Sequence, residues 1–112
     1  GMSVSNVKEE QGKIVIALKG DIDLENAGEV RKALLANLKQ KKDLLIDLSA
    51  VTYIDSSGIA SLVEGLQVAR KQKNELSLVS VSVRARRVLE LARLDKVFAI
   101  HADVAAALAA RP

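Results

Sequence analysis

The sequence alternates between two hydrophobic periods, and this alternation constrains the fold more than any other feature. Short apolar or alternating runs predict five strands, at residues 4–7, 14–18, 43–48, 76–81 and 97–100. Apolar residues three and four positions apart predict a helix after each strand except the first. The predicted order is ββαβαβαβα. It favours an α/β domain with a mixed, mostly parallel five-stranded sheet, which begins with an antiparallel hairpin and is covered by four helices.

Polar residues mark the predicted helix ends. Asp23, Ser82 and Asp103 stand where side chains cap the first amide groups of the first, third and fourth helices. The first helix runs to about residue 40 and the second to about residue 73, where Asn74 follows basic residues as a natural stop. Gly65 lies inside the second helix, where glycine is about 1 kcal/mol less stable than alanine. We therefore expect Gly65 to permit close packing against a neighbouring element.

The composition predicts one domain with an aliphatic core. The chain has 112 residues, of which 49% are hydrophobic and 2% aromatic, so the core must consist of Leu, Val, Ile and Ala. No apolar run approaches the roughly 20 residues of a membrane span, no signal peptide is visible and cysteine is absent. We expect a cytoplasmic protein without membrane insertion and a single domain over residues 1–112, in which Gly1-Met2 is a tag remnant or the start.

The net charge of the chain is modest and does not favour nucleic-acid binding. The net charge is +3, and we interpret the basic residues at 39–42 and 84–87 as solvated helix faces and helix ends. A nucleic-acid-binding protein needs a denser basic face, and for single strands it also needs aromatic residues on which bases stack. The sequence therefore predicts no nucleic-acid partner.

Residues 55–58, Asp-Ser-Ser-Gly, lie between a predicted buried strand and an amphipathic helix. Asp and Ser accept hydrogen bonds from the free amides of a first helical turn, which also carries the positive end of the helix dipole. We expect one of Ser56 and Ser57 to cap the helix and the other to display a hydroxyl where a phosphate is tolerated. Gly58 is expected to keep this turn uncluttered. Spacing alone leaves open that both serines are capping residues and nothing more.

Enzyme chemistry finds little support in the sequence. His101 is the only histidine and is expected at the surface, and zinc-ligand clusters and glycine-rich phosphate loops are absent from the sequence. Asp21, Asp23 and Asp55 follow predicted strands and could bind Mg²⁺ or accept a phosphoryl group, as in a response-regulator receiver. The initial hairpin and the lack of a lysine after the last strand disfavour a receiver. We predict no enzyme, no cofactor and no metal.

Motifs in three parts of the chain carry a family resemblance. They comprise residues 20–23 (GDID), residues 46–58 (IDLSAVTYIDSSG), and the positions 78–79, 88–89 and 94–98. In order and spacing they resemble the STAS domain (sulfate transporter and anti-sigma factor antagonist), specifically the stand-alone bacterial anti-sigma factor antagonist. The middle motif is specific, and the others support it across nearly the whole chain.

The resemblance implies a mechanism. In this family the serine next to the glycine, here Ser57, is phosphorylated by a partner that is both a serine kinase and an anti-sigma factor. The unphosphorylated protein binds that partner and so frees a sigma factor, and a serine phosphatase resets the switch. By this resemblance the chain is a phosphoprotein in a partner-switching cascade, monomeric or weakly dimeric.

The predicted partner surface surrounds Ser57. A phosphate adds about −1.5 to −2 charges at neutral pH, which a helix N-terminus accommodates, so we expect the domain to stay folded. The switch then acts by bulk and by charge repulsion against a docked partner. The predicted partner-binding residues are Asp21, Asp23, Asp55, Ser56, Ser57 and Gly58, together with Ala60, Ser61 and Glu64 on the expected exposed side of the second helix.

Two other functions stay open. Stand-alone STAS domains also resemble the small subunit of lipid-transport ABC complexes, where the domain packs on an ATPase. Those subunits often lack the serine pair, so Ser56 and Ser57 favour the switch, whereas Ala60 and Glu64 depart mildly from the expected small or apolar residues and leave the partner's identity open. Nucleotide binding at the same loop is a weaker option, since Tyr53 is the one aromatic residue near Ser57 in the sequence.

Overall fold

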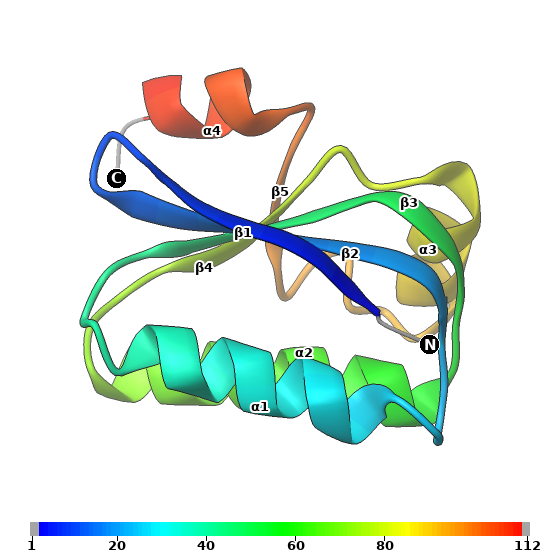
Figure 1. Ribbon diagram of the computed structural model, residues 1–112. Helices are drawn as coiled ribbons and strands as arrows, with labels where there is room; N and C mark the ends of the chain where they lie inside the picture. The colour runs from blue at the N-terminus through cyan, green and yellow to red at the C-terminus, as the bar shows by residue number, and fades with distance from the viewer. Residues whose placement is uncertain (1–2, 111–112) are drawn as a thin grey trace.

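A five-stranded mixed sheet crosses the middle of the molecule (Figure 1). The computed structural model describes residues 3–110, so the expectation for Gly1-Met2 lies outside the described residues. The strands are β1 (Val4–Glu10), β2 (Lys13–Ile22), β3 (Leu44–Ile54), β4 (Leu76–Val79) and β5 (Ala99–His101), and they lie in that order across the sheet. β1 pairs with β2 antiparallel, and β2 to β5 pair in parallel. The predicted hairpin followed by parallel strands is confirmed.

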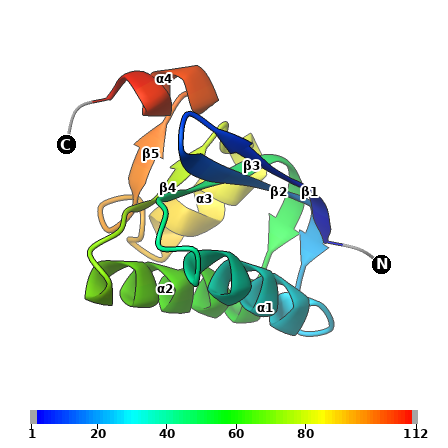
Figure 2. The ribbon, with the colours of Figure 1, turned by 60° about the vertical axis from the view of Figure 1, so that its left-hand side comes forward.

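Helices cover both faces of this sheet. They are α1 (Ala27–Leu38), α2 (Ser56–Lys71), α3 (Val83–Leu91) and α4 (Val104–Ala109). Figures 1 and 2 show α1 and α2 side by side along one face, with α4 on the opposite face. Within residues 3–110 no helix combines the length and the hydrophobicity needed to cross a membrane.

The division of the core follows from the alternation of side chains along the strands. Ile14 and Ile16 of β2 belong to the main core cluster, which also contains the buried residues of α1 and α2. Val15 belongs to a second cluster with Leu45 of β3 and Ala107 of α4. Because successive side chains of a strand point to opposite faces, the continuous apolar run in β2 is what a strand covered on both faces requires.

Gly65 confirms the expectation of close packing inside α2. A Cβ atom at this position would lie 3.0 Å from Cδ1 of Leu34 in α1 and 3.1 Å from Cδ1 of Leu76 in β4. The missing side chain therefore lets α2 approach both elements, which offsets the lower helix propensity of glycine.

The start of α1 differs from the prediction. Asp23 does not cap the helix: its side chain accepts a hydrogen bond from the Glu25 amide (3.0 Å), and its carbonyl accepts from the amides of Asn26 and Ala27. Asn26 holds the N-cap position without a side-chain cap, and its Oδ1 instead accepts from the Asp23 amide (2.8 Å). The short polar side chains of Asp and Asn stabilise a turn here, which delays the helix by three residues.

Other element ends also differ from the prediction. β3 continues to Ile54 rather than stopping near residue 48, because it pairs with β2 as far as Ile22. In its second half, residues 49–54, exposed residues are interrupted by the buried Val51 and Ile54, so the continuous apolar run on which the prediction depended is missing there. Lys73 rather than Asn74 adopts the left-handed conformation after α2, with φ of 64°. The predicted caps Ser82 and Asp103 are confirmed, since their side chains accept from the amides of Ala85 and Ala106.

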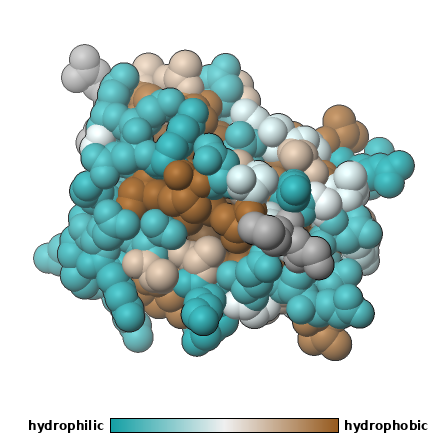
Figure 3. Space-filling view, viewed as in Figure 1, coloured by the Kyte–Doolittle hydropathy of each residue, from teal (hydrophilic) through white to brown (hydrophobic). Residues whose placement is uncertain are grey.

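The surface seen in Figure 3 is mostly hydrophilic, with an apolar patch between β1 and α1. A shallow hollow in this region is lined by Val4 of β1 and by Ala33 and Ala36 of α1. Glu29 and Lys32 also line it, so polar side chains border the apolar surface.

Candidate functional site

Asp55 caps the entrance to α2. Its backbone is extended (φ −97°, ψ −173°), and its Oδ1 accepts hydrogen bonds from the amides of Ser57 (2.8 Å) and Gly58 (3.1 Å). The expectation that Ser56 or Ser57 would be the cap is therefore wrong. A carboxylate accepts these amide hydrogen bonds at the positive end of the helix dipole, so capping requires neither serine hydroxyl.

The two serines occupy the first two positions of α2. Ser56 is exposed and Ser57 is half-buried. The Asp55 amide donates to the Ile22 carbonyl at the end of β2 (3.0 Å), so the start of α2, which follows β3 in the chain, is also hydrogen-bonded to the end of β2. The site therefore lies at the carboxyl ends of β2 and β3, the edge at which α/β sheets place their functional loops.

Gly58 has a different role from the one predicted. It is buried, and a Cβ atom here would lie 2.6 Å from Cγ1 of Ile54 and 2.8 Å from Cγ2 of Ile22. Glycine is therefore needed because the first turn of α2 packs directly on the strand ends. Keeping the turn open to a partner is not its role.

Asp21 and Asp23 reach the same edge of the sheet by strand register. Asp21 pairs with Tyr53 and Ile22 with Ile54 across β2 and β3. Asp21 is exposed and accepts a hydrogen bond from Oγ1 of Thr52 (2.6 Å). Together with Asp55 these carboxylates give the site an acidic border. Within residues 3–110 no group of three His, Cys, Asp or Glu side chains is arranged to hold a metal ion.

The outward side of α2 matches the prediction only in part. Ala60 is exposed and Glu64 is partly exposed, but Ser61 is buried, with 6% of its surface accessible. The Ser61 hydroxyl donates to the Ala27 carbonyl of α1 (2.9 Å), so Ser61 links the two helices. The prediction that Ser61 lies on an exposed docking face is wrong, because α1 packs against that side of α2.

Glu64 has a partner within the chain. Its Oε2 lies 2.8 Å from Nε of Arg31 in α1. The hydrogen bond from Arg31 lowers the pKa of Glu64 below its ordinary value, and the same bond raises the pKa of Arg31. Glu64 is therefore already oriented toward α1 by its contact with Arg31.

Sequence reasoning missed one exposed apolar residue beside the site. Leu24 is 80% exposed in the turn between β2 and α1, and Tyr53, at the end of β3, is 51% exposed. The sequence did contain a signal for this residue: Leu24 is a large apolar residue in a polar turn, and it does not belong to the apolar stripe of the helix that follows. Exposed apolar residues beside a charged rim are typical of protein interaction surfaces.

Comparison with known proteins places the chain in a family. A family model described as "STAS domain" matches residues 5–107. The chain belongs to the STAS domain family. An anti-sigma-B factor antagonist of Bacillus subtilis is 31% identical over 97 residues, which cover 87% of this chain and 89% of that relative.

Solved structures agree with this assignment. An anti-sigma factor antagonist from Mycobacterium paratuberculosis superposes with a TM-score of 0.83 at 29% identity, over 92% of this STAS domain and 88% of that chain. The Bacillus cell fate determinant SpoIIAA in its phosphorylated form shares the fold, with a TM-score of 0.71 at 16% identity over 95% of this chain and 98% of that one. These relatives are anti-sigma factor antagonists and do not favour the transport-subunit alternative.

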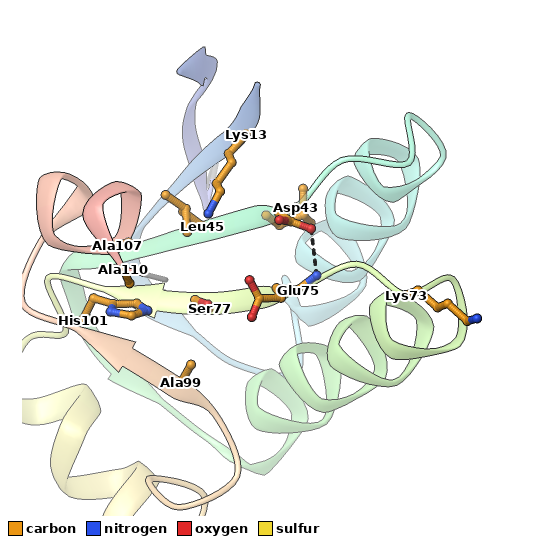
Figure 4. Close-up of a pocket in the computed structure, with 11 residues that line it drawn as sticks. Lys13, Asp43, Leu45, Lys73, Glu75, Ser77, Ala99, His101, Ala107 and Ala110 are labelled. Carbon is orange, nitrogen blue, oxygen red and sulfur yellow. Dashed lines mark hydrogen bonds between the residues drawn. The ribbon is translucent and has the colours of Figure 1, made fainter. Parts of the chain in front are cut away.

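A hollow of about 700 Å³ lies at the other end of the sheet in this STAS domain (Figure 4). It lies at the starts of β2, β3 and β4, and Figure 4 shows Glu75 and His101 on either side of Ser77. His101 was expected at the surface, but it lies in β5 and is half-buried. Asp43 at the hollow's edge already accepts hydrogen bonds from the Glu75 amide (2.9 Å) and the Asn74 side chain (3.1 Å). The hollow is therefore separate from the Ser57 turn.

Proposed function

We propose that this STAS domain protein is an anti-sigma factor antagonist whose switch residue is Ser57. In its unphosphorylated form it binds an anti-sigma factor with serine kinase activity and so releases a sigma factor. Phosphorylation of Ser57 ends that binding, and a serine phosphatase restores it. The protein acts as a substrate and binding partner, not as an enzyme, and a role in sigma-factor control places it in the cytoplasm.

The observation that carries this proposal is that α2 is capped by Asp55 and not by Ser57. Asp55 supplies the cap, so modification of Ser57 does not remove a cap from α2. The added dianion would stand at the positive end of a 16-residue helix, where negative charge is stabilising. SpoIIAA has the same fold in its phosphorylated form, which agrees with a switch that leaves the fold intact.

The proposed partner surface is the edge of the sheet around Ser57. It contains Asp21, Asp23 and Asp55 as a charged rim, Ser56 and Ser57 at the helix entrance, and Leu24, Tyr53, Ala60 and Glu64 as exposed or partly exposed neighbours. Burial of Leu24 and Tyr53 would supply apolar contact, while the carboxylates would increase repulsion once Ser57 carries phosphate. Ser61 and Gly58 support this surface from below and do not contact the partner.

The choice between the two serines depends on the family resemblance, and phosphorylation assays can decide it. The protein is used to capture its kinase from the native host, and the purified kinase is then incubated with ATP and each variant. We expect wild type and Ser56→Ala to gain one phosphate and Ser57→Ala to gain none, with the site mapped by mass spectrometry. Phosphate on Ser57→Ala would overturn the acceptor assignment. A captured transporter ATPase in place of a kinase would overturn the function.

A further inference from the structure

The outward face of α3 carries apolar surface that the proposed switch does not use. Val83, Arg87 and Leu91 are spaced four residues apart, so they lie along one side of the helix. Ala85 and Leu89 are on the opposite side, buried in the main core. Val83 is 77% exposed and Leu91 is 82% exposed. The helix thus presents to solvent a stripe of two aliphatic side chains with an arginine between them.

The same helix carries a net positive charge, from three arginines and one glutamate. Arg84, Arg86 and Arg87 are all exposed, and within residues 3–110 none of them lies within 4.0 Å of a carboxylate oxygen. Residues 83–96 contain five basic and two acidic residues, so the net charge of this segment, +3, equals that of the whole chain. Arg84 lies in the first turn of α3, where the helix dipole disfavours cations, and Arg86 and Arg87 lie in the middle of the helix, where the dipole offers them no stabilisation. Helix stability therefore does not explain their position.

We propose that the stripe Val83–Arg87–Leu91, with Arg84 beside it, is a docking surface for an acidic segment of another protein. The segment presents a carboxylate flanked by apolar side chains. A guanidinium group binds a carboxylate through two parallel hydrogen bonds, and apolar contacts on both sides exclude water from that pair. Arginine surrounded by apolar surface is a common source of binding energy in protein interfaces.

Two other anionic partners fit this surface less well. Helices that lie on membranes have a continuous apolar face, whereas α3 has nine residues and two large exposed apolar side chains. Single-stranded nucleic acids require aromatic stacking, and α3 contains no aromatic residue.

The stripe does not include Ser57 or any other residue of the turn at the start of α2. α3 is fastened to the sheet by Ser82, whose hydroxyl donates to the Val51 carbonyl of β3 (2.8 Å). Leu89 fixes the buried side of the helix in the core. The stripe is thus presented on a rigid element, so exposed substitutions there should leave the fold unchanged.

Peptide titration of the ¹⁵N-labelled full chain tests the proposal. The probe is a synthetic acidic helical peptide in which two leucines flank a glutamate at four-residue spacing, and a reference peptide carries glutamine in place of that glutamate. We expect saturable shifts confined to α3 and its neighbours, and weaker binding of the reference peptide. Arg87→Glu and Leu91→Ser should each weaken binding at least about tenfold. Lys39→Glu makes the same charge change at the end of α1 and should alter binding by less than about twofold.

Three results would overturn the proposal. The first is the absence of saturable binding at millimolar peptide, and the second is an equal loss in Arg87→Glu and Lys39→Glu, which would mean that binding follows net charge alone. The third is sedimentation with phosphatidylglycerol vesicles but not with phosphatidylcholine vesicles, lost in Arg87→Glu, without any peptide binding. Matching circular dichroism spectra and melting temperatures of all variants would exclude unfolding as the cause of lost binding.

Discussion

Ser57 and Gly58 are adjacent, but the structure restricts the side chain at one position and not at the other. Glycine is required at position 58 because Ile22 and Ile54 leave no space for a side chain. Ser57 is freed from a structural role, because Asp55 supplies the cap. At the residue scale the site therefore combines one position without room for a side chain with one position whose hydroxyl is not needed for the cap.

Substitution of Gly58 should destabilise the protein. Gly58→Ala places a methyl group against Ile22 and Ile54, and overpacking of this kind costs about 1–3 kcal/mol. The matched control is Gly28→Ala in α1, where no atom lies within 4 Å of the added Cβ. There alanine should increase stability by about 0.5–1 kcal/mol. Urea unfolding of both variants measures the difference, and equal stabilities would contradict the packing role of Gly58.

At the scale of the secondary-structure element, α2 connects the site to the rest of the fold. Its start is fastened to β2 and β3, its middle approaches α1 through Gly65, and the hydroxyl of Ser61 bonds to the Ala27 carbonyl. One face of α2 is thus fixed, and the other, with Ala60, is left to solvent. The helix thus holds the serine pair in place at the end of the sheet.

Loss of the cap should weaken α2 as a whole. Asp55→Ala leaves the amides of Ser57 and Gly58 without their acceptor, which should lower the free energy of unfolding by about 1 kcal/mol. Asp55→Asn retains an acceptor oxygen in the same place and should lose less. Chemical denaturation followed by circular dichroism compares the two variants. An Asp55→Ala protein as stable as Asp55→Asn would mean that Asp55 does not act as the cap.

At the scale of the molecule, separate surfaces lie on different parts of one sheet. The Ser57 turn is at the carboxyl ends of β2 and β3, the hollow of Figure 4 is at the opposite strand ends, and α3 carries the basic stripe. The core beneath them is continuous from α1 to α3. A change of charge at one surface can therefore alter binding while the core stays packed.

The phosphate mimic Ser57→Asp tests this independence. The variant should fold as wild type does, because negative charge at the start of α2 is favourable, yet it should bind the cognate kinase at least about tenfold more weakly by charge repulsion. Circular dichroism and calorimetric titration measure the two properties separately. Ser57→Asn has a similar size without the charge and should retain more of the affinity. An unfolded Ser57→Asp protein would refute the argument that a dianion is tolerated at this helix terminus.

The sequence by itself determined the order of elements, the hairpin, the caps Ser82 and Asp103 and the position of the serine pair at a helix start. Those features depend on hydrophobic period and on hydrogen bonds between near neighbours, which a linear chain displays directly. Only the tertiary structure decided that Gly58 is fixed by packing and that Ser61 is buried. The cap by Asp55 and the turn at Asp23 are local, but neighbouring polar residues compete for each of these roles, and the sequence does not choose between them. Burial and close approach arise where segments distant in sequence meet: Ala27 with Ser61, and Ile22 with Gly58. The local sequence of a helix or strand does not show which of its sides another element will cover.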